Sequence, residues 1–163
     1  MNDASVAGKD SGIPRTETVS GFLVRLDLAY DPRSRTWLEP IEGGRVRIGL
    51  DPVEVEASGT VAALSLPAPG SVVRRGGELG SLEAEKFVGP LLSPVSGTVT
   101  AVNDQVLARP SEVDRDPYLA WLVELAPDPE VGGPVELVQG ADAVRAWFEQ
   151  VVVEYRQKGV LAE

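Results

Sequence analysis

Lysine is scarce in this chain, and the one interior lysine has the chemistry to carry an attached group. Only three of the 15 basic residues are lysines: Lys9 and Lys158 lie near the ends, and Lys86 lies between them. A lysine amine can be acylated to a stable amide, whereas the guanidinium of Arg, with a pKa above about 12, cannot serve in this way. A codon bias toward Arg would leave the same scarcity. Lysine scarcity alone therefore does not identify Lys86 as a modification site, and the residues around Lys86 must supply the evidence.

The chain contains no cysteine and no histidine. Their absence excludes disulfides, metal sites built on thiolate or imidazole, cysteine nucleophiles and catalytic triads that use histidine. Carboxylate pairs remain available for acid–base chemistry among the 25 acidic residues. A protein that borrows its chemistry from an attached group needs neither of the missing residues. We therefore expect a carrier with no catalytic residues and no metal, rather than an enzyme.

The net charge of −10 and the pI of about 4.5 limit which classes of partner this protein can bind. Nucleic-acid binding is not expected, because it needs basic patches, and Arg74-Arg75 is the single basic doublet. Acidity suits transient docking on basic partners, and it equally serves solubility. No apolar run approaches the roughly 18 residues that span a bilayer, and Met1–Ser20 has no apolar signal core. We expect a cytoplasmic protein that does not enter a membrane.

The 163 residues fit one domain with a tail. Residues 1–19 are rich in Ser, Gly, Asp and Thr without periodicity, which predicts a flexible N-terminal tail ahead of a domain over 20–163. A helix is predicted from Asp51-Pro52, a capping oxygen followed by a proline preset for the first turn, to a stop at Gly59. A C-terminal helix is predicted over 141–158, because apolar residues recur there at helical period.

Most of the remaining chain has the patterns of short strands separated by turn residues. One strand is predicted over Gly21–Tyr30, and a hairpin is predicted around Glu42-Gly43-Gly44. A helical turn is expected over 105–113. The predicted strands, in chain order, are 21–30, 36–41, 45–50, 60–66, 72–73, 79–83, 87–92, 98–103 and 121–125. The fold class is therefore mainly β, with short helices and a C-terminal helix.

Two segments, over 59–83 and 97–124, resemble one another. Each opens with Gly-Thr-Val and runs strand, turn, strand. Two such units facing each other would form a small flattened barrel, or sandwich, with quasi-two-fold symmetry. Glu85-Lys86 then falls in the tight turn between the units, where a modifying enzyme can reach the amine and a rigid sheet still fixes its direction.

Several motifs point to one family. They are Gly49 with Gly59-Thr60-Val61 ten residues on, Leu66-Pro67 with Gly70 and Val72, Leu82-Glu83-Ala84-Glu85-Lys86, Ser93-Pro94-Val95-Ser96-Gly97 with Val99, Val102 and Asn103, Asp116-Pro117-Tyr118, and Trp121-Leu122. Together they resemble the lipoyl and biotinyl carrier domains, and most of all the glycine-cleavage H-protein family. The resemblance covers roughly residues 21–127 and the terminal helix, so it extends over the whole fold.

The resemblance implies a lipoyl arm attached to Lys86 through an amide by a lipoate ligase or lipoyl transferase. Glu83, Glu85 and Phe87 would be flanking residues that the modifying enzyme recognises, although Glu83 also fits an ordinary exposed carboxylate. Lipoyl is favoured over biotin because biotinyl domains flank their lysine with methionines, and Met1 is the only methionine here. The arm would carry an aminomethyl group and reducing equivalents between glycine decarboxylase, aminomethyltransferase and dihydrolipoyl dehydrogenase.

The sequence also departs from the family pattern. H-proteins usually carry Tyr-x-x-x-His-x-Trp at the first hairpin, whereas here Tyr30 and Trp37 stand one residue further apart, with Arg33-Ser34-Arg35-Thr36 between them and no histidine. Three functions therefore stay open. One is the carrier of the glycine cleavage system, and another is an H-like lipoate-binding protein of a heterodisulfide-reductase-like sulfur-oxidation system. The last is an unmodified H-like module with an interaction or regulatory role.

Overall fold

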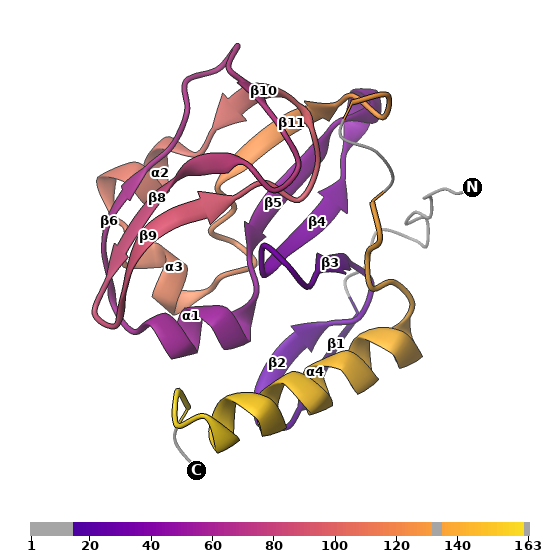
Figure 1. The fold of residues 1–163 in the computed structure, drawn as a ribbon, viewed down its shortest axis with the longest axis vertical. Coiled ribbons are helices and arrows are strands. Elements are labelled where there is room, and N and C mark those ends of the chain that lie inside the picture. The colour runs from indigo at the N-terminus through magenta and orange to yellow at the C-terminus, as the bar shows by residue number, and fades with distance from the viewer. Residues whose placement is uncertain (1–14, 132–134, 162–163) are drawn as a thin grey trace.

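The protein is a sandwich of small antiparallel sheets with one long helix across its end (Figure 1). The computed structural model describes residues 15–131 and 135–161. Its strands are β1 (Thr16–Val19), β2 (Phe22–Arg25), β3 (Ala29–Asp31), β4 (Thr36–Pro40), β5 (Val46–Leu50), β6 (Val61–Ser65), β7 (Val72–Val73), β8 (Glu78–Ala84), β9 (Phe87–Leu92), β10 (Gly97–Val102) and β11 (Val123–Pro127). Its helices are η2 (Glu42–Gly44), α1 (Pro52–Ser58), α2 (Asp104–Ala108), α3 (Glu112–Arg115) and α4 (Ala141–Gln157).

The strands form three sheets. The largest has the order β3-β4-β5-β11-β10-β7, a second has the order β6-β8-β9, and β1 and β2 pair by themselves. Side chains from the two larger sheets meet in one hydrophobic cluster, which includes Ile48, Leu82 and Leu125. The predicted mainly β class, with short helices and a C-terminal helix, is confirmed.

A bulge in β8 turns the strand that leads to Lys86. The register with β9 shifts between Glu78 and Ser81, so that Leu79 and Leu82 are both buried although they are three residues apart. Gly80 makes the bulge possible, since it has a φ of 112° and a Cβ there would lie 2.0 Å from the carbonyl oxygen of Ser65. Only glycine fits this position.

The structure corrects the prediction for the N-terminal segment. Thr16–Val19 is not part of a tail, because it forms β1, paired antiparallel with β2. The rest of the tail prediction, up to residue 14, lies outside the described residues. The single strand predicted over Gly21–Tyr30 is also wrong, since turn residues between Arg25 and Ala29 divide it into β2 and β3.

The second of the two similar segments also differs from the prediction. Between β10 and β11 the chain forms the two short helices α2 and α3, and Val113 lies in α3. A helical turn was expected there, but strand, turn, strand describes only the first segment. The C-terminal helix is confirmed within one residue of its predicted end, at Gln157.

Helix α4 closes a second hydrophobic cluster against β1 and β2. The buried face of the helix carries Val144, Phe148, Val151 and Val152. The ring of Phe148 meets that of Tyr30 edge to face, with the centroids 5.0 Å apart. No helix in the two described ranges is long and apolar enough to cross a membrane.

Helix α1 begins and ends as its sequence predicts. The carboxylate of Asp51 accepts a hydrogen bond from the backbone N–H of Glu54 at 2.8 Å, Pro52 occupies the first turn, and Gly59 follows the last turn with a φ of 79°. The side chain of Asp51 is fully buried, and its second oxygen accepts from Nε of Arg35 at 2.9 Å. The pair joins α1 to the loop between β3 and β4.

Arg35 also joins α1 to α4. Its Nη1 donates to the hydroxyl of Tyr155, and this hydroxyl donates to Glu54 at 2.9 Å. The guanidinium lies 5.0 Å from the ring centroid of Tyr155 and 5.2 Å from that of Trp147. Helix α4 is therefore held by hydrogen bonds and cation–π contacts in addition to apolar packing.

Burial and charge have opposed effects on the pKa values of this cluster. Desolvation raises the pKa of Asp51 to about 6, although Arg35 acts in the opposite direction. Desolvation would lower the pKa of Arg35, but the neighbouring Asp51, Tyr155 and Glu54 outweigh it and raise that pKa. Burial raises the pKa of Tyr155 to about 12, so its hydroxyl keeps the proton that it donates to Glu54.

We expect Asp51→Ala to lower the free energy of unfolding by about 3 kcal/mol at pH 7, because it removes the cap of α1 and leaves Arg35 without its buried partner. Asp51→Asn should cost less, since its side-chain oxygen can still accept from the N–H of Glu54. Urea denaturation of the three proteins measures both changes. Equal losses in the two variants would show that the cap contributes nothing.

Stability should also depend on pH through Asp51. The folded-state pKa of about 6 lies above the ordinary value of 3.8, so the folded protein binds a proton that the unfolded chain releases between these values. The contribution of this proton to stability is present at low pH and is lost as the pH rises through 6. We expect the stability of the parent protein relative to Asp51→Asn to fall by about 1–3 kcal/mol between pH 4 and pH 7. A flat difference in urea titrations would contradict this.

Candidate functional site

Lys86 lies at the tip of a two-residue hairpin turn. Ala84 pairs with Phe87 across β8 and β9, so that only Glu85 and Lys86 connect the two strands. The side chain of Lys86 is exposed, and it forms no ion pair within the described residues. Its amine is thus accessible to an acylating enzyme without any unfolding.

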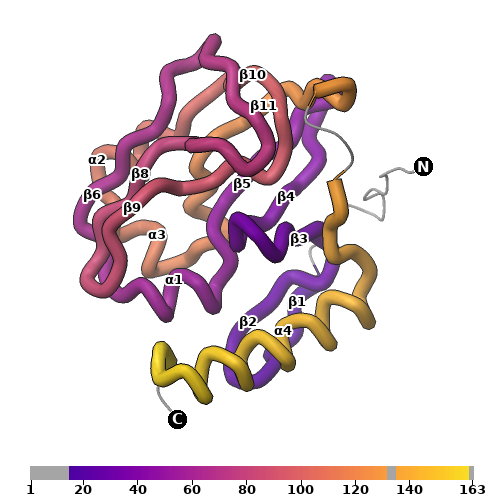
Figure 2. The backbone as a smooth tube through the Cα atoms, viewed as in Figure 1, coloured from indigo at the N-terminus to yellow at the C-terminus, as the bar shows by residue number. Residues whose placement is uncertain are grey.

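The end of α1 holds this turn from beside it (Figure 2). The N–H of Glu85 donates to the carbonyl of Thr60 at 2.9 Å, and the N–H of Lys86 donates to the carbonyl of Ser58 at 2.8 Å. Both turn N–H groups are therefore used by another element of the fold. A hairpin tip of this kind is exposed and rigid at once.

The three predicted flanking residues have different surroundings. Phe87 is half-buried and contacts the core between the sheets. Glu83 is exposed on β8, opposite Val88 on β9. The carboxylate of Glu85 lies over the α1–β6 corner, with Oε1 3.4 Å from the N–H of Thr60. The structure thus brings all three to the hairpin, and only Phe87 faces inward.

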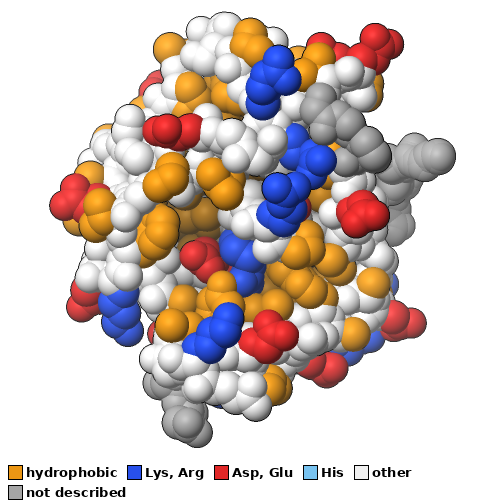
Figure 3. All heavy atoms as spheres, in the orientation of Figure 1, with side chains coloured by type: hydrophobic (Ala, Val, Ile, Leu, Met, Phe, Trp, Pro, Cys, Tyr) orange, Lys and Arg blue, Asp and Glu red, His pale blue; other side chains and the backbone are white. Residues whose placement is uncertain are grey.

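Two hollows meet beside Phe87 on the face shown in Figure 3. The first hollow lies next to Lys86 and is bounded by the ends of α1 and α4, including Tyr155 and Lys158. The second lies beyond Phe87 and is bounded by β9 and by Arg33 and Arg35 of the β3–β4 loop. Phe87 and Glu54 line both hollows, so the two adjoin at these side chains.

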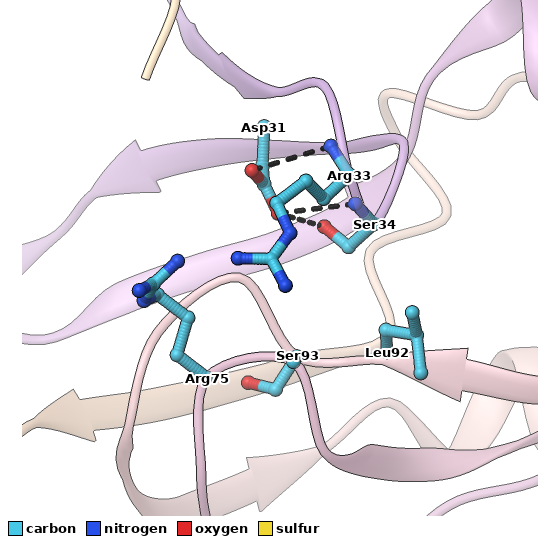
Figure 4. A pocket seen from close by; sticks show the side chains of 7 residues that line it. Asp31, Arg33, Ser34, Arg75, Leu92 and Ser93 are labelled. Atoms are coloured by element: carbon cyan, nitrogen blue, oxygen red, sulfur yellow. Dashed lines mark hydrogen bonds between the residues drawn. The ribbon is translucent and has the colours of Figure 1, made fainter. Parts of the chain in front are cut away.

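A third and smaller hollow lies between the β3–β4 loop and the turn at Arg75-Gly76 (Figure 4). The carboxylate of Asp31 closes the loop, accepting from the N–H of Ser34 at 3.1 Å and from its hydroxyl at 2.6 Å. The side chain of Arg33 extends from this loop toward Arg75. These contacts fix the loop that forms one wall of the second hollow.

The sequence analysis missed part of this surface. Glu54 and Tyr155 were not predicted as site residues, because they come from two helices and lie 101 positions apart in the chain. Lys158 was noted only as one of the three lysines. The one signal for Tyr155 was its place among the residues that recur at helical period in the predicted C-terminal helix. Arg33 and Arg35 were noted as departures from a family pattern, and the structure places both at the second hollow.

The chemistry of the site is that of an amine beside a partly apolar groove. Among the described residues, no cluster of three potential ligands could hold a metal ion. A long acyl chain fits the surroundings of Lys86, because the amine is exposed and the adjoining hollows present Phe87, Leu82 and Leu91 together with polar groups.

Comparisons with known proteins agree with this geometry. Residues 28–150 match the family model described as glycine cleavage H-protein. A glycine cleavage system H protein of Myxococcus xanthus is 40% identical over 106 residues, which are 64% of this chain and 81% of that protein. The glycine cleavage system H protein 2 of Aquifex aeolicus is 28% identical over 138 residues, covering 84% of this chain and 86% of that protein.

A solved structure extends the comparison to the fold. The crystal structure of a glycine cleavage system H protein from Mycobacterium marinum superimposes with a TM-score of 0.65 at 30% identity, covering 77% of this chain and 99% of that one. The exposed lysine on a rigid hairpin, the fold and the sequence matches lead to one conclusion: this chain belongs to the glycine cleavage H-protein family.

Proposed function

We propose that this protein is a lipoyl carrier whose arm is attached to Lys86 by an amide bond. The observation that carries the proposal is the exposed amine of Lys86 on a hairpin tip held by two backbone hydrogen bonds, in a family whose members are typically non-catalytic carriers. Lipoate ligase or lipoyl transferase would be the modifying enzyme. The cytoplasmic location expected from the sequence is part of the same proposal.

The chain itself would hold and shelter the attached group. The anchored turn fixes the base of the arm, and Phe87 with the two hollows offers a partly apolar surface next to it. A dithiolane that opens to two thiols supplies the redox and group-transfer chemistry when it is bound. No catalytic residue of this chain is needed, which fits the absence of cysteine and histidine.

The first candidate for the cargo is an aminomethyl group, carried with reducing equivalents between glycine decarboxylase, aminomethyltransferase and dihydrolipoyl dehydrogenase. The names of the relatives support it. So does Glu54, a carboxylate at the junction of the two hollows, whose charge suits a protonated amine.

A second candidate is a lipoyl carrier of another redox route, such as a heterodisulfide-reductase-like sulfur-oxidation system. The second hollow favours it. Arg33 is exposed there without an ion pair among the described residues, and its guanidinium offers several N–H donors. Such donors suit a cargo that is negatively charged and rich in acceptor oxygens.

Intact-mass spectrometry of protein from its own host tests the proposed modification. We expect one lipoyl adduct per chain, located on Lys86 by peptide mapping. Lys86→Arg should fold normally and carry no adduct, because the guanidinium cannot be acylated in this way. Lys9→Arg and Lys158→Arg are the matched controls and should both keep it. A bare Lys86 in cells with active lipoylation would leave the unmodified interaction module as the remaining reading.

Partner assays separate the two candidate routes. With tetrahydrofolate present to accept the one-carbon unit and ammonia released, we expect glycine decarboxylase and aminomethyltransferase to reduce the lipoylated protein in a glycine-dependent manner. Dihydrolipoyl dehydrogenase should then reoxidise it with NAD. Absorbance of the NADH formed measures this. The Lys86→Arg protein is the blank. Activity restricted to purified sulfur-oxidation partners would instead support the second candidate.

A further inference from the structure

The turn that holds Lys86 rests on one corner of the fold, formed by Ser58, Gly59 and Thr60 between α1 and β6. The carbonyls of Ser58 and Thr60 accept from the two turn N–H groups, and Gly59 lies between them. Both hydrogen bonds therefore depend on the path that the chain takes through Gly59. This path has a φ of 79°, which side chains other than glycine rarely adopt.

The side chain of Glu85 packs directly on Gly59. A Cβ at position 59 would lie 2.7 Å from Oε1 of Glu85 and 2.8 Å from its Cβ, closer than such atoms can approach. The same carboxylate lies 3.4 Å from the N–H of Thr60. The absence of a side chain at Gly59 thus creates the space that Glu85 fills.

Glu83 has no comparable contact. It is exposed on β8, between Ala63 and Val88 on the neighbouring strands, and its carboxylate forms no hydrogen bond or ion pair within the described residues. Two carboxylates close to the same lysine are therefore in different physical situations, one packed on the corner and the other directed to solvent.

We propose that Glu85, packed on Gly59, is a positioning residue that fixes the direction of Lys86. Glu83, which the family resemblance already marks as a contact of the modifying enzyme, serves as the comparison. This inference rests on the proposed modification of Lys86. An acyl transfer needs the amine in line with the activated acyl carbon. If the hairpin turn moves relative to Ser58–Thr60, a smaller fraction of the enzyme complexes hold Lys86 in this geometry, and kcat falls. A lost contact with the enzyme instead weakens binding.

Steady-state kinetics with a lipoate ligase, lipoate and ATP separate these roles, with the unmodified full chain as substrate. Glu85→Ala should lower kcat by roughly three- to tenfold with little change in KM, because the turn loses its packing on Gly59. Glu85→Gln should restore kcat, since it has the same shape. Glu83→Ala and Glu83→Gln should both raise KM, because both remove the charge that the enzyme contacts.

A glycine pair supplies the structural control. Gly59→Ala introduces a methyl group against Glu85, whereas Gly44→Ala introduces one into open space at a similar φ of 73°. Both variants bear backbone strain, and only the first disturbs the corner. We expect Gly59→Ala to accelerate amide hydrogen exchange at Glu85 and Lys86 and to lower kcat, and Gly44→Ala to do neither.

The outcomes distinguish the inference from the function on which it rests. If the parent chain is never acylated, the proposed function fails, and hydrogen exchange in the two glycine variants still tests the corner. If the parent chain is acylated and Glu85→Ala retains the parental kcat, or Gly59→Ala exchanges at Lys86 like Gly44→Ala, the positioning role is overturned. Equal KM effects from substitutions at Glu83 and Glu85 would overturn it as well.

Discussion

The site depends on two hydrogen bonds between backbone atoms, in which the N–H groups of Glu85 and Lys86 donate to the carbonyls of Thr60 and Ser58. A hairpin tip usually combines exposure with motion, because its N–H groups have only water or each other as partners. Here the corner between α1 and β6 accepts hydrogen bonds from both N–H groups. The amine of Lys86 keeps its exposure, while these two bonds hold the backbone beneath it.

The corner between α1 and β6 is held in place by contacts that reach as far as α4. Helix α1 leads into it, the cap at Asp51 fixes the start of α1, and Arg35 joins this cap to Tyr155 on α4. The buried Asp51–Arg35 pair is weak evidence for stability, because desolvation offsets much of the attraction. Its geometry does specify one arrangement of loop and helices. The hydrophobic cluster between the two larger sheets and the cluster under α4 are distinct, and these contacts link the elements that carry them.

The local parts of the fold could be predicted from sequence, because their signals are local. Asp51-Pro52 with Gly59 defined α1, and the two residues between β8 and β9 placed Lys86 on a tip. The strand at Thr16–Val19 was missed because its own four residues carry no strand pattern. It is stabilised by pairing with β2 and by packing against α4, and neither contact can be seen in the local sequence. The surface around the lysine was missed for a related reason. Tyr155 reaches it only through the packing of a helix that begins more than 50 residues after the hairpin.

The shared hollow of Lys86 and Lys158 has a practical consequence. With three lysine amines in the chain, a short homobifunctional cross-linker has few ways to react, and one of them joins the β8–β9 hairpin to the end of α4. Acylation of Lys86 removes this option. The yield of the intramolecular cross-link between Lys86 and Lys158, read from one gel or mass spectrum, would therefore report two things. It would show what fraction of Lys86 is acylated, and whether the β8–β9 hairpin lies close to the end of α4.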